Sequence, residues 1–441
     1  MELHDKIMLP DLGKEAVLRS VKDAEYSALD NALAEKNTSL DFYYNRNLDE
    51  HIKQYFSTES LSQIPPVLMS LVKRFAKSRL MLLKEPAERF INGEFNEYYN
   101  EKTHNLDSKV REFGELAWLL GSCHLQSMYN PKTQRIEYKI HPIVKEYVYD
   151  GEVYGVSYEI HRDFNGDRQF AFWSKPLDGE QGMHFRFNVN GKMMPVGNNL
   201  EMVNPYNLIP LSKVEFNTNA SDVTRCAVHA SNAWTEVMIA TRLMMGSPVI
   251  TGLDTEIPPY LKFGVDRLIA LPEGASMQYV SPSANLTQMI QSVKDLINQV
   301  GQNHSLTIRW GESSAPPSGE ALKILSVDNI ETRESDIPVF RDFEHDRYEI
   351  DRELLSVHEG TNLSDKYSVD YPEVGFPMTW TEERNKLEFM MEHNLITREE
   401  LIRKFNPDID EAELALKMEE LEPEQSQSPN NNPLLEALQG G

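Results

Sequence analysis

The sequence predicts an α+β protein that is built from several parts. Helical patterns dominate residues 1 to about 130, whereas short alternating runs rich in Tyr, Val and Phe dominate residues 135 to about 209. After them, two long amphipathic patterns bracket a short segment with strand-like texture. At 441 residues, the chain is long enough for about three domains or one elongated multi-part subunit.

The composition is that of an ordinary globular chain with a strongly acidic balance. Hydrophobic residues make up 40% and charged residues 26%, so the chain can bury a sizeable core. The 44 Lys and Arg residues against 69 Asp and Glu residues leave a formal net charge of -25. Because proteins that grip nucleic acid neutralise phosphates with cations, this balance disfavours tight groove binding of DNA or RNA.

Cysteine usage and the absence of targeting patterns indicate the compartment. Cys123 and Cys226 are the only cysteines, and they lie far apart without a CxxC partner. We therefore expect neither a disulfide framework nor a cysteine-rich zinc site, and a reducing setting fits best. The N-terminus lacks a basic segment followed by an apolar core, and no run of about 18 apolar residues occurs. We expect a protein that is neither secreted nor membrane-spanning.

Two helices are predicted in the N-terminal part. One covers Ile64–Lys84 and opens at the Pro65-Pro66 pair, because proline is favoured at a helix start. The other covers Leu106–Met128 and carries apolar residues at helical spacing. The first helix has a basic face that is either a phosphate-facing patch or the solvated face of an amphipathic helix. Its cations are Lys73, Arg74, Lys77, Arg79 and Lys84.

Residues 135 to about 209 are predicted to form strands joined by tight turns. Glu137–Ile140 and Val153–Ile160 alternate in the manner of half-buried strands. Asp163–Gly166 contains an Asn-Gly pair, which favours a hairpin turn because both residues tolerate positive φ. This block is therefore predicted to form a sheet.

Two long helices are predicted over Ser221–Met245 and Asn285–His304. The second holds only Lys294 and Asp295 as charged residues, which is unusual in so acidic a chain. Weakly charged, polar outer faces suggest surfaces that meet another chain, although an ordinary core helix fits the pattern equally well. Between these helices, Gly246–Val280 is predicted to form a small β-containing insertion.

A loop and a further long helix follow. Thr307–Pro317 has the composition of a mobile loop, and the next helix is predicted from Ser318 to about His358 with a bend at Pro338. Short capped helices are then expected from Thr379, before a polar tail at 422–441 that we expect to be disordered. The expected caps are Thr381, Thr397 with Glu400, and Asp410 with Glu413.

Motifs of catalysis and cofactor binding are absent from the sequence. We find no phosphate-binding P-loop, no dinucleotide glycine pattern, no HExxH and no nucleophile elbow. No catalytic residue, metal site or cofactor is therefore predicted. The alternative is a carboxylate-rich, metal-dependent enzyme acting on nucleic acid through Asp342, Glu344 and Asp346. A spacing of two turns successive helical side chains by about 200°, so these three would not share one face.

The order of these features resembles that of the portal proteins of tailed bacteriophages, over nearly the whole chain. Two local signals carry the resemblance: the run Asn204–Pro210 that closes the strand-rich block, and Ser318-Gly319-Glu320-Ala321-Leu322-Lys323 at the start of the long helix. The segment Asn394–Glu400 also resembles the one these proteins carry after their long helix. Each motif is a weak signal alone, and the resemblance rests on the order in which they occur.

The resemblance implies an elongated portal subunit with a wing, a stem, a clip, a tunnel loop and an α-helical crown. The wing would comprise residues 1–220, and the two stem helices would be 221–245 and 284–304, with the clip at 246–283 between them. The tunnel loop would be 305–317, the long wing helix and its return 318–378, the crown 379–421, and the disordered tail 422–441.

The resemblance also assigns residues to these parts. In the tunnel loop, Arg309 and Trp310, with Lys323 nearby, would touch the DNA backbone weakly, and Arg309→Ala with unchanged DNA packaging would remove that idea. The loop residues are Thr307, Arg309, Trp310, Gly311, Ser313, Ser314, Pro316 and Pro317. The family motif at the helix start is Ser318, Gly319, Ala321, Leu322 and Lys323. The partner-binding clip residues would be Thr251, Asp254, Glu256, Lys262, Asp266 and Arg267.

The implied function is that of a ring at one capsid vertex. Portal proteins form homo-oligomeric rings, usually of twelve subunits, through which double-stranded DNA enters at packaging and leaves at ejection. The implied partners are other copies of the chain, the DNA, the large terminase, neck or adaptor proteins, and the major capsid and scaffold proteins. The implied location is the virion, after assembly in the host cytoplasm. An acidic channel would suit this role, because it repels the duplex and keeps it from binding.

Overall fold

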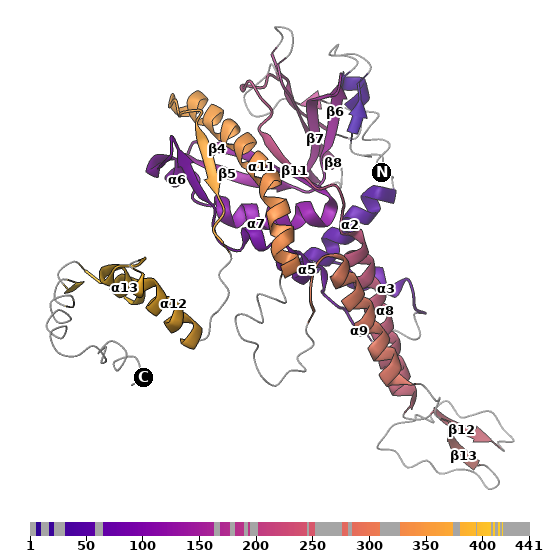
Figure 1. Cartoon of the computed structure of the whole chain (residues 1–441). Helices are drawn as coiled ribbons and strands as arrows, with labels where there is room; N and C mark the ends of the chain where they lie inside the picture. Colours follow the sequence, from indigo (N-terminus) through magenta and orange to yellow (C-terminus); the bar gives the residue numbers. More distant parts are fainter. Residues whose placement is uncertain are drawn as a thin grey trace, which may run out of the picture. The chain divides into compact units, whose positions relative to one another are not determined.

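A computed structural model divides the chain into two compact units, and each is described by itself. The first comprises residues 1–312 and 326–374, and the second comprises 313–325 and 375–441. Helices and strands together build the first unit, which confirms the predicted mixed fold (Figure 1). The described residues are 6–9, 17–21, 31–57, 65–162, 168–176, 181–188, 193–194, 202–244, 247–251, 276–280, 285–308, 327–373, 380–393, 395–406, 409–410, 413–414 and 417.

The largest sheet has six strands in the order β1-β6-β7-β8-β9-β10. β1 pairs with β6 in parallel, and the other neighbouring strands are antiparallel. Aromatic rings stack on one another along it, with Phe172 and Phe185 at a centroid distance of 5.1 Å. The strands confirm the predicted sheet, while the Asp163–Gly166 turn lies outside the described residues. Their bounds are β1 Lys6–Met8, β6 Lys145–Tyr149, β7 Glu152–Arg162, β8 Arg168–Ser174, β9 His184–Asn188 and β10 Met193–Met194.

Two three-stranded sheets have the orders β11-β4-β5 and β14-β2-β3, and all their pairings are antiparallel. The first joins a strand at the end of the strand-rich block to two strands that precede it. The second joins a strand beyond residue 360 to a hairpin near residue 90. The bounds are β2 Glu88–Ile91, β3 Glu94–Phe95, β4 Ser122–Asn130, β5 Arg135–His141, β11 Leu211–Glu215 and β14 Tyr367–Asp370.

The helix predicted over Leu106–Met128 is shorter than expected. α7 covers Leu106–Leu120, and β4 follows it directly. Gly121 has a φ of 86°, the left-handed conformation that ends helices, and its carbonyl accepts a hydrogen bond from the N–H of Phe216 at 2.7 Å. The prediction was wrong beyond residue 120 because β4 pairs with β5 and β11, and these pairings cannot be read from the local pattern.

The helix predicted from Pro65 also begins later. α5 covers Val72–Arg79, and residues 65–71 form a strap without helix or strand. In this strap, the N–H of Val67 donates to Oγ1 of Thr235 at 2.9 Å, and the N–H of Met69 donates to Oγ of Ser231 at 3.0 Å. The prediction was wrong here because hydroxyl groups of a distant helix satisfy the backbone donors that a helix would otherwise satisfy.

Replacing Thr235 with Val should loosen this strap. Valine keeps the branched shape but leaves the half-buried N–H of Val67 without its acceptor, so we expect a loss of about 1–2 kcal/mol in the free energy of unfolding. Thr235→Ser is the matched control, because it retains the hydroxyl. Urea denaturation of the three proteins measures the difference, and equal losses in both variants would contradict a role for the hydrogen bond.

The main core of the first unit gathers helices from both ends of the sequence. Phe113 of α7 stacks on Phe343 of α11 (Val327–Glu359) at a centroid distance of 4.7 Å. Gly114 permits this close approach, because a Cβ there would lie 2.5 Å from Cδ1 of Leu83 and 3.0 Å from Cζ of Phe340. The remaining N-terminal elements are α2 Asn31–Tyr44, α3 Leu48–Lys53, the 3-10 turn η1 Met81–Leu83 and α6 Glu97–Lys102.

The long helix α11 covers Val327–Glu359 and continues through Pro338. A fully buried ion-pair cluster fastens it to the rest of the unit. Arg347 donates to Glu344 at 2.6 Å and pairs with Asp351 on the next turn, while Glu344 also accepts from Arg89 of β2 at 2.8 Å. Three tyrosine hydroxyls donate to the same carboxylates: Tyr99 and Tyr138 to Asp351 at 2.9 and 2.8 Å, and Tyr367 to Glu344 at 2.9 Å.

The second unit contains α12 (Trp380–Glu392) and α13 (Arg398–Phe405) among its described residues. The capping box predicted at α13 is confirmed: the N–H of Glu400 donates to Oγ1 of Thr397 at 3.2 Å, and the N–H of Thr397 donates to the Glu400 carboxylate at 2.8 Å. Asp410 likewise accepts from the N–H of Glu413 at 2.7 Å. Thr381 was wrongly predicted as a cap, because it lies within α12.

Candidate functional site

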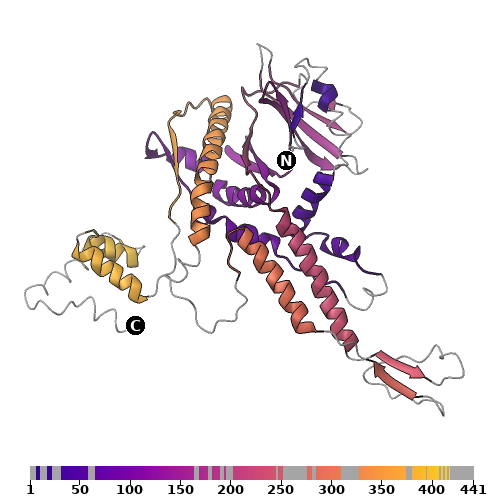
Figure 2. The same cartoon turned by 45° about the vertical axis from the view of Figure 1, so that its right-hand side comes forward.

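Two long helices leave the body of the first unit side by side and carry a β-hairpin (Figure 2). α8 covers Ser221–Met244 and α9 covers Leu286–Asn303, which correspond to about 36 Å and about 27 Å of helix. β12 (Ser247–Thr251) begins two residues after α8 ends, and it pairs antiparallel with β13 (Ser276–Val280). Both helix predictions are confirmed to within a few residues, and so is the β-containing segment between them.

α8 and α9 pack against each other, and we call their buried small and branched residues the seam. Ala227 and Ala230 of α8 are fully buried, as is Ile297 of α9. Alanine lets the helix axes approach closely, and the branched side chains opposite fill the remaining space. The other buried members of this seam and its root are Val223, Cys226, Val237, Val293 and Val300.

Polar contacts fix the root of the pair to the body. Asp222, in the first turn of α8, hydrogen-bonds to Nε2 of His304 at 2.8 Å, and His304 packs edge-on against Trp118 of α7. Burial alone would raise the pKa of Asp222, but the His304 contact outweighs it and the pKa is lowered. Gly301 allows the chain to turn back, because a Cβ there would lie 2.8 Å from Cδ1 of Ile308. The emerging direction of both helices is therefore set by the body.

The outward side of α9 carries few charges. On α9, the exposed residues include only one charged side chain, Asp295, among the described positions. Met238 and Leu296 are large apolar residues with exposed fractions of 46% and 37%. Burying amides and apolar groups costs less than burying charges, so such a surface suits contact with another chain. The exposed polar residues of α9 are Thr287, Gln288, Gln291, Ser292, Gln299, Gln302 and Asn303.

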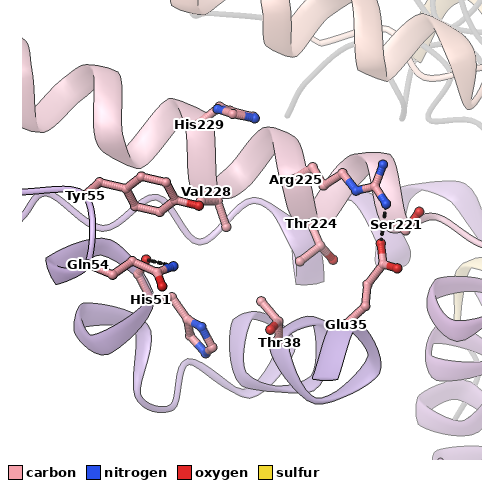
Figure 3. Close-up of a pocket in the computed structure, with 10 residues that line it drawn as sticks. All are labelled: Glu35, Thr38, His51, Gln54, Tyr55, Ser221, Thr224, Arg225, Val228 and His229. Carbon is pink, nitrogen blue, oxygen red and sulfur yellow. Dashed lines mark hydrogen bonds and ion pairs between the residues drawn. The ribbon is translucent and has the colours of Figure 1, made fainter. Parts of the chain in front are cut away.

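A cavity of about 280 Å³ lies where α2 and α3 meet α8 (Figure 3). Arg225 of α8 closes one end through an ion pair with Glu35 of α2 at 2.8 Å. His51 is tied to Asp41 at 3.0 Å, while His229 is exposed. The sequence carried no signal for this cavity, because three helices that are far apart along the chain contribute its walls. Its lining is completed by Thr38, Gln54, Tyr55, Ser221, Thr224 and Val228.

Of the predicted site residues, the structure describes two. Thr251 ends β12, where its hydroxyl lies 2.8 Å from that of Ser276 on β13. Thr307 is exposed just after α9. The others lie outside the described residues: Arg309, Trp310, Gly311, Ser313, Ser314, Pro316 and Pro317 of the predicted loop; Ser318, Gly319, Ala321, Leu322 and Lys323 of the predicted helix start; and Asp254, Glu256, Lys262, Asp266 and Arg267 of the predicted insertion.

The carboxylates of the enzyme alternative do not converge. Glu344 is fully buried between Arg89 and Arg347, whereas Asp342 and Asp346 are exposed on the other side of α11. The separation agrees with the helical spacing argument. Within the described part of the chain, no three His, Cys, Asp or Glu side chains are arranged to hold a metal ion.

The buried histidine, carboxylate and thiol groups that could act as ligands or nucleophiles have structural partners or are inaccessible. His124 of β4 lies 3.1 Å from Glu146 of β6, and Lys213 of β11 pairs with the same carboxylate at 2.8 Å, so this cluster ties two sheets together. Cys123 and Cys226 are buried free thiols, and burial raises the pKa of both, to about 11 for Cys226. Neither thiol is poised as a nucleophile.

Comparisons with known proteins give structural similarity alone. No family model matches the chain, and no curated protein matches its sequence. One similar solved chain is described as the neck of an empty gene transfer agent particle, computed with C6 symmetry; it is 13% identical, with a TM-score of 0.37, over 79% of this chain and 93% of that chain. Another, from the virion of a native gene transfer agent particle, is 12% identical, with a TM-score of 0.35, over 80% and 92%. These scores are too low to carry a functional argument.

No helix of the described residues is both long enough and apolar enough to cross a bilayer. Even α8, the longer of the paired helices, carries charged side chains along its length, with Asp222, Arg225 and Glu236 among them.

Proposed function

We propose that this chain is a portal subunit. In this proposal, copies of the chain form a closed ring at one capsid vertex, and double-stranded DNA passes through the ring during packaging and ejection. The observation that carries it is the helix pair α8/α9, rooted in the body and joined at its far end by the β12/β13 hairpin. Such a pair has the position and the surface that a stem between a wing and a clip requires.

The chemistry of the pair supports ring assembly. A cyclic ring repeats one heterologous contact, so a charged stem would place like charges at regular intervals around the axis. On α9, the exposed described residues are instead mostly amides and hydroxyls, with Leu296 and a single charge, Asp295. On α8, Met238 is exposed near Glu236, and the exposed Arg225 is paired with Glu35 of α2. The predicted clip, residues 246–283, would dock the large terminase and the neck or adaptor proteins. Capsid and scaffold proteins would meet the body of the first unit.

The acidity of the chain is consistent with a conduit for DNA. A net charge of -25 opposes tight binding, and a duplex that must slide in both directions cannot be held by many phosphate contacts. Residues 305–317 would project into the channel, where Arg309 and Trp310 would make weak, local contacts with the backbone. DNA specificity is not needed, because the channel acts on any sequence.

Native mass spectrometry and negative-stain electron microscopy of the purified chain test the proposal. We expect rings with a central hole and a mass of about twelve chains. Leu296→Glu should break these rings, because each copy would place a new charge on the outer face of the stem. Phe95→Glu is the matched control, since Phe95 is an exposed aromatic on β3, away from the helix pair. A wild-type chain that stays monomeric at high concentration would overturn the proposal.

A further inference from the structure

A cationic helix face stands out on the first unit of this acidic chain. α5 exposes Arg74 and Lys77, and Lys73 lies half-buried beside them. Lys73 covers the ring of Tyr43, with Nζ 5.0 Å from the ring centroid. Within the described residues, none of these three cations forms an ion pair. Among the described residues, the helix therefore presents an excess of positive charge without a direct ion-pair partner.

A neighbouring arginine adds to this excess, and one buried acid offsets part of it. Arg111 of α7 donates to the carbonyl oxygens of Leu83 and Lys84 at 2.9 and 2.6 Å, which holds its guanidinium at the same surface. The nearby carboxyl of Glu115 is buried and accepts from the Tyr43 hydroxyl at 2.6 Å. Burial raises the pKa of this carboxyl, while the charges of Lys77, Lys73 and Arg111 oppose the shift, so one buried acid lies among several cations.

A matching anionic face lies on α11. Asp342, Asp346 and Glu349 follow one another at spacings of four and three residues, which places them on one side of the helix, and all three are exposed. None of them forms an ion pair within the described part of the chain. Partial burial and the repulsion from Glu349 and Asp342 raise the pKa of Asp346, as expected for acids without counter-ions.

We infer that the basic face of α5 docks against the acidic face of α11 on a second copy of this chain. This inference rests on the proposed ring, because a cyclic ring needs two different surfaces on each subunit that complement one another. The opposite charges of the two faces meet that need, and they would fix which surfaces meet and in what register. A duplex is the weaker occupant of the α5 face, because the whole chain carries a net charge of -25 that opposes its approach.

Charge exchange between the two faces tests the inference. Lys77→Glu and Asp346→Lys each place like charges across every contact of the ring, and we expect the concentration for half-dissociation to rise at least about tenfold. The double variant, with both substitutions in one chain, restores opposite charges at every contact and should return to within about threefold of wild type. Lys132→Glu, an exposed lysine on the β4–β5 turn, is the control for net charge. Native mass spectrometry over a dilution series measures all five proteins, and circular dichroism checks folding.

The outcomes separate the two proposals. If wild type forms rings and Lys77→Glu does not weaken them, this inference is wrong, although the proposed ring is not. The same holds if the double variant does not recover the stability of the wild-type ring. A wild-type chain that never forms rings overturns both. If wild-type rings retain a 30-base-pair duplex on a filter, and Lys77→Glu abolishes retention without weakening the rings, then the α5 face binds nucleic acid and the inference is wrong.

Discussion

Replacing Arg347 with Met should destabilise the first unit by about 3–5 kcal/mol, the largest effect expected of a single substitution in this chain. Arg347 is fully buried and is the shared cation of Glu344 and Asp351. Methionine has a similar length, so the loss would come mainly from stranded carboxylates rather than from a cavity. Glu344 retains Arg89, whereas Asp351 keeps no cation among the described residues and relies on hydroxyl donors such as those of Tyr99 and Tyr138.

The matched control for this variant is Arg341→Met on the exposed side of the same helix. It makes the same chemical change without breaking a buried ion pair, and we expect less than about 0.5 kcal/mol of change. Urea denaturation followed by tryptophan fluorescence measures both. If Arg347→Met lowers the free energy of unfolding by less than about 1 kcal/mol, then the buried carboxylates tolerate the loss of their shared cation, and the prediction is wrong.

Lowering the pH from 8 to 5 should destabilise the sheets by about 2 kcal/mol through His141 alone. His141 of β5 is buried against Gln126 and Tyr158, and burial, followed by repulsion from Lys139 and His124, lowers its pKa to about 3. In the unfolded chain this histidine takes up a proton near pH 6.5. Because the unfolded state binds more protons between these values, stability is present above pH 6.5 and is lost as the pH falls.

His141→Gln should flatten this dependence. Glutamine keeps a polar contact with Gln126 but does not titrate, so the difference in unfolding free energy between pH 8 and pH 5 should shrink by about 2 kcal/mol. His104→Gln, at an exposed position of the same unit, is the control and should leave the slope unchanged. A slope unaffected by His141→Gln would assign the acid sensitivity to other groups. Glu146 is not one of them: burial opposes its charge, but His124 and Lys213 hold its pKa at about 2, so its stabilising contribution is lost only below pH 5.

Periodicity predicted the elements that local patterns specify well. α8 and α9 came from long amphipathic repeats, and the capping box at Thr397 came from side-chain chemistry within four residues. Where the pattern was ambiguous, partners distant in sequence decided the structure. Residues 122–128 form a strand because β5 and β11 pair with them, and residues 65–71 stay extended because α8 supplies hydroxyl acceptors.

Buried charge was the hardest feature to predict, although part of it had a local signal. Arg347 lies between Glu344 and Asp351 at helical spacing, which could have indicated an ion-pair ladder. Nothing local indicated that the ladder is buried, because Arg89 and three tyrosines reach it from strands and helices more than 15 residues away. The carboxylates that suggested a metal site were thus structural or solvent-exposed.

The sequence by itself determined the mixed helix and sheet composition, the paired long helices with a β segment between them, and the acidity that disfavours tight binding of nucleic acid. These follow from local periodicity and total charge, which do not depend on folding. Only the tertiary structure decided which charges are neutralised and which remain free. It buries Glu344 and Arg347 against each other and leaves α5 basic and the outer face of α11 acidic. Ion pairing depends on distances in space, and residues far apart in the sequence set those distances.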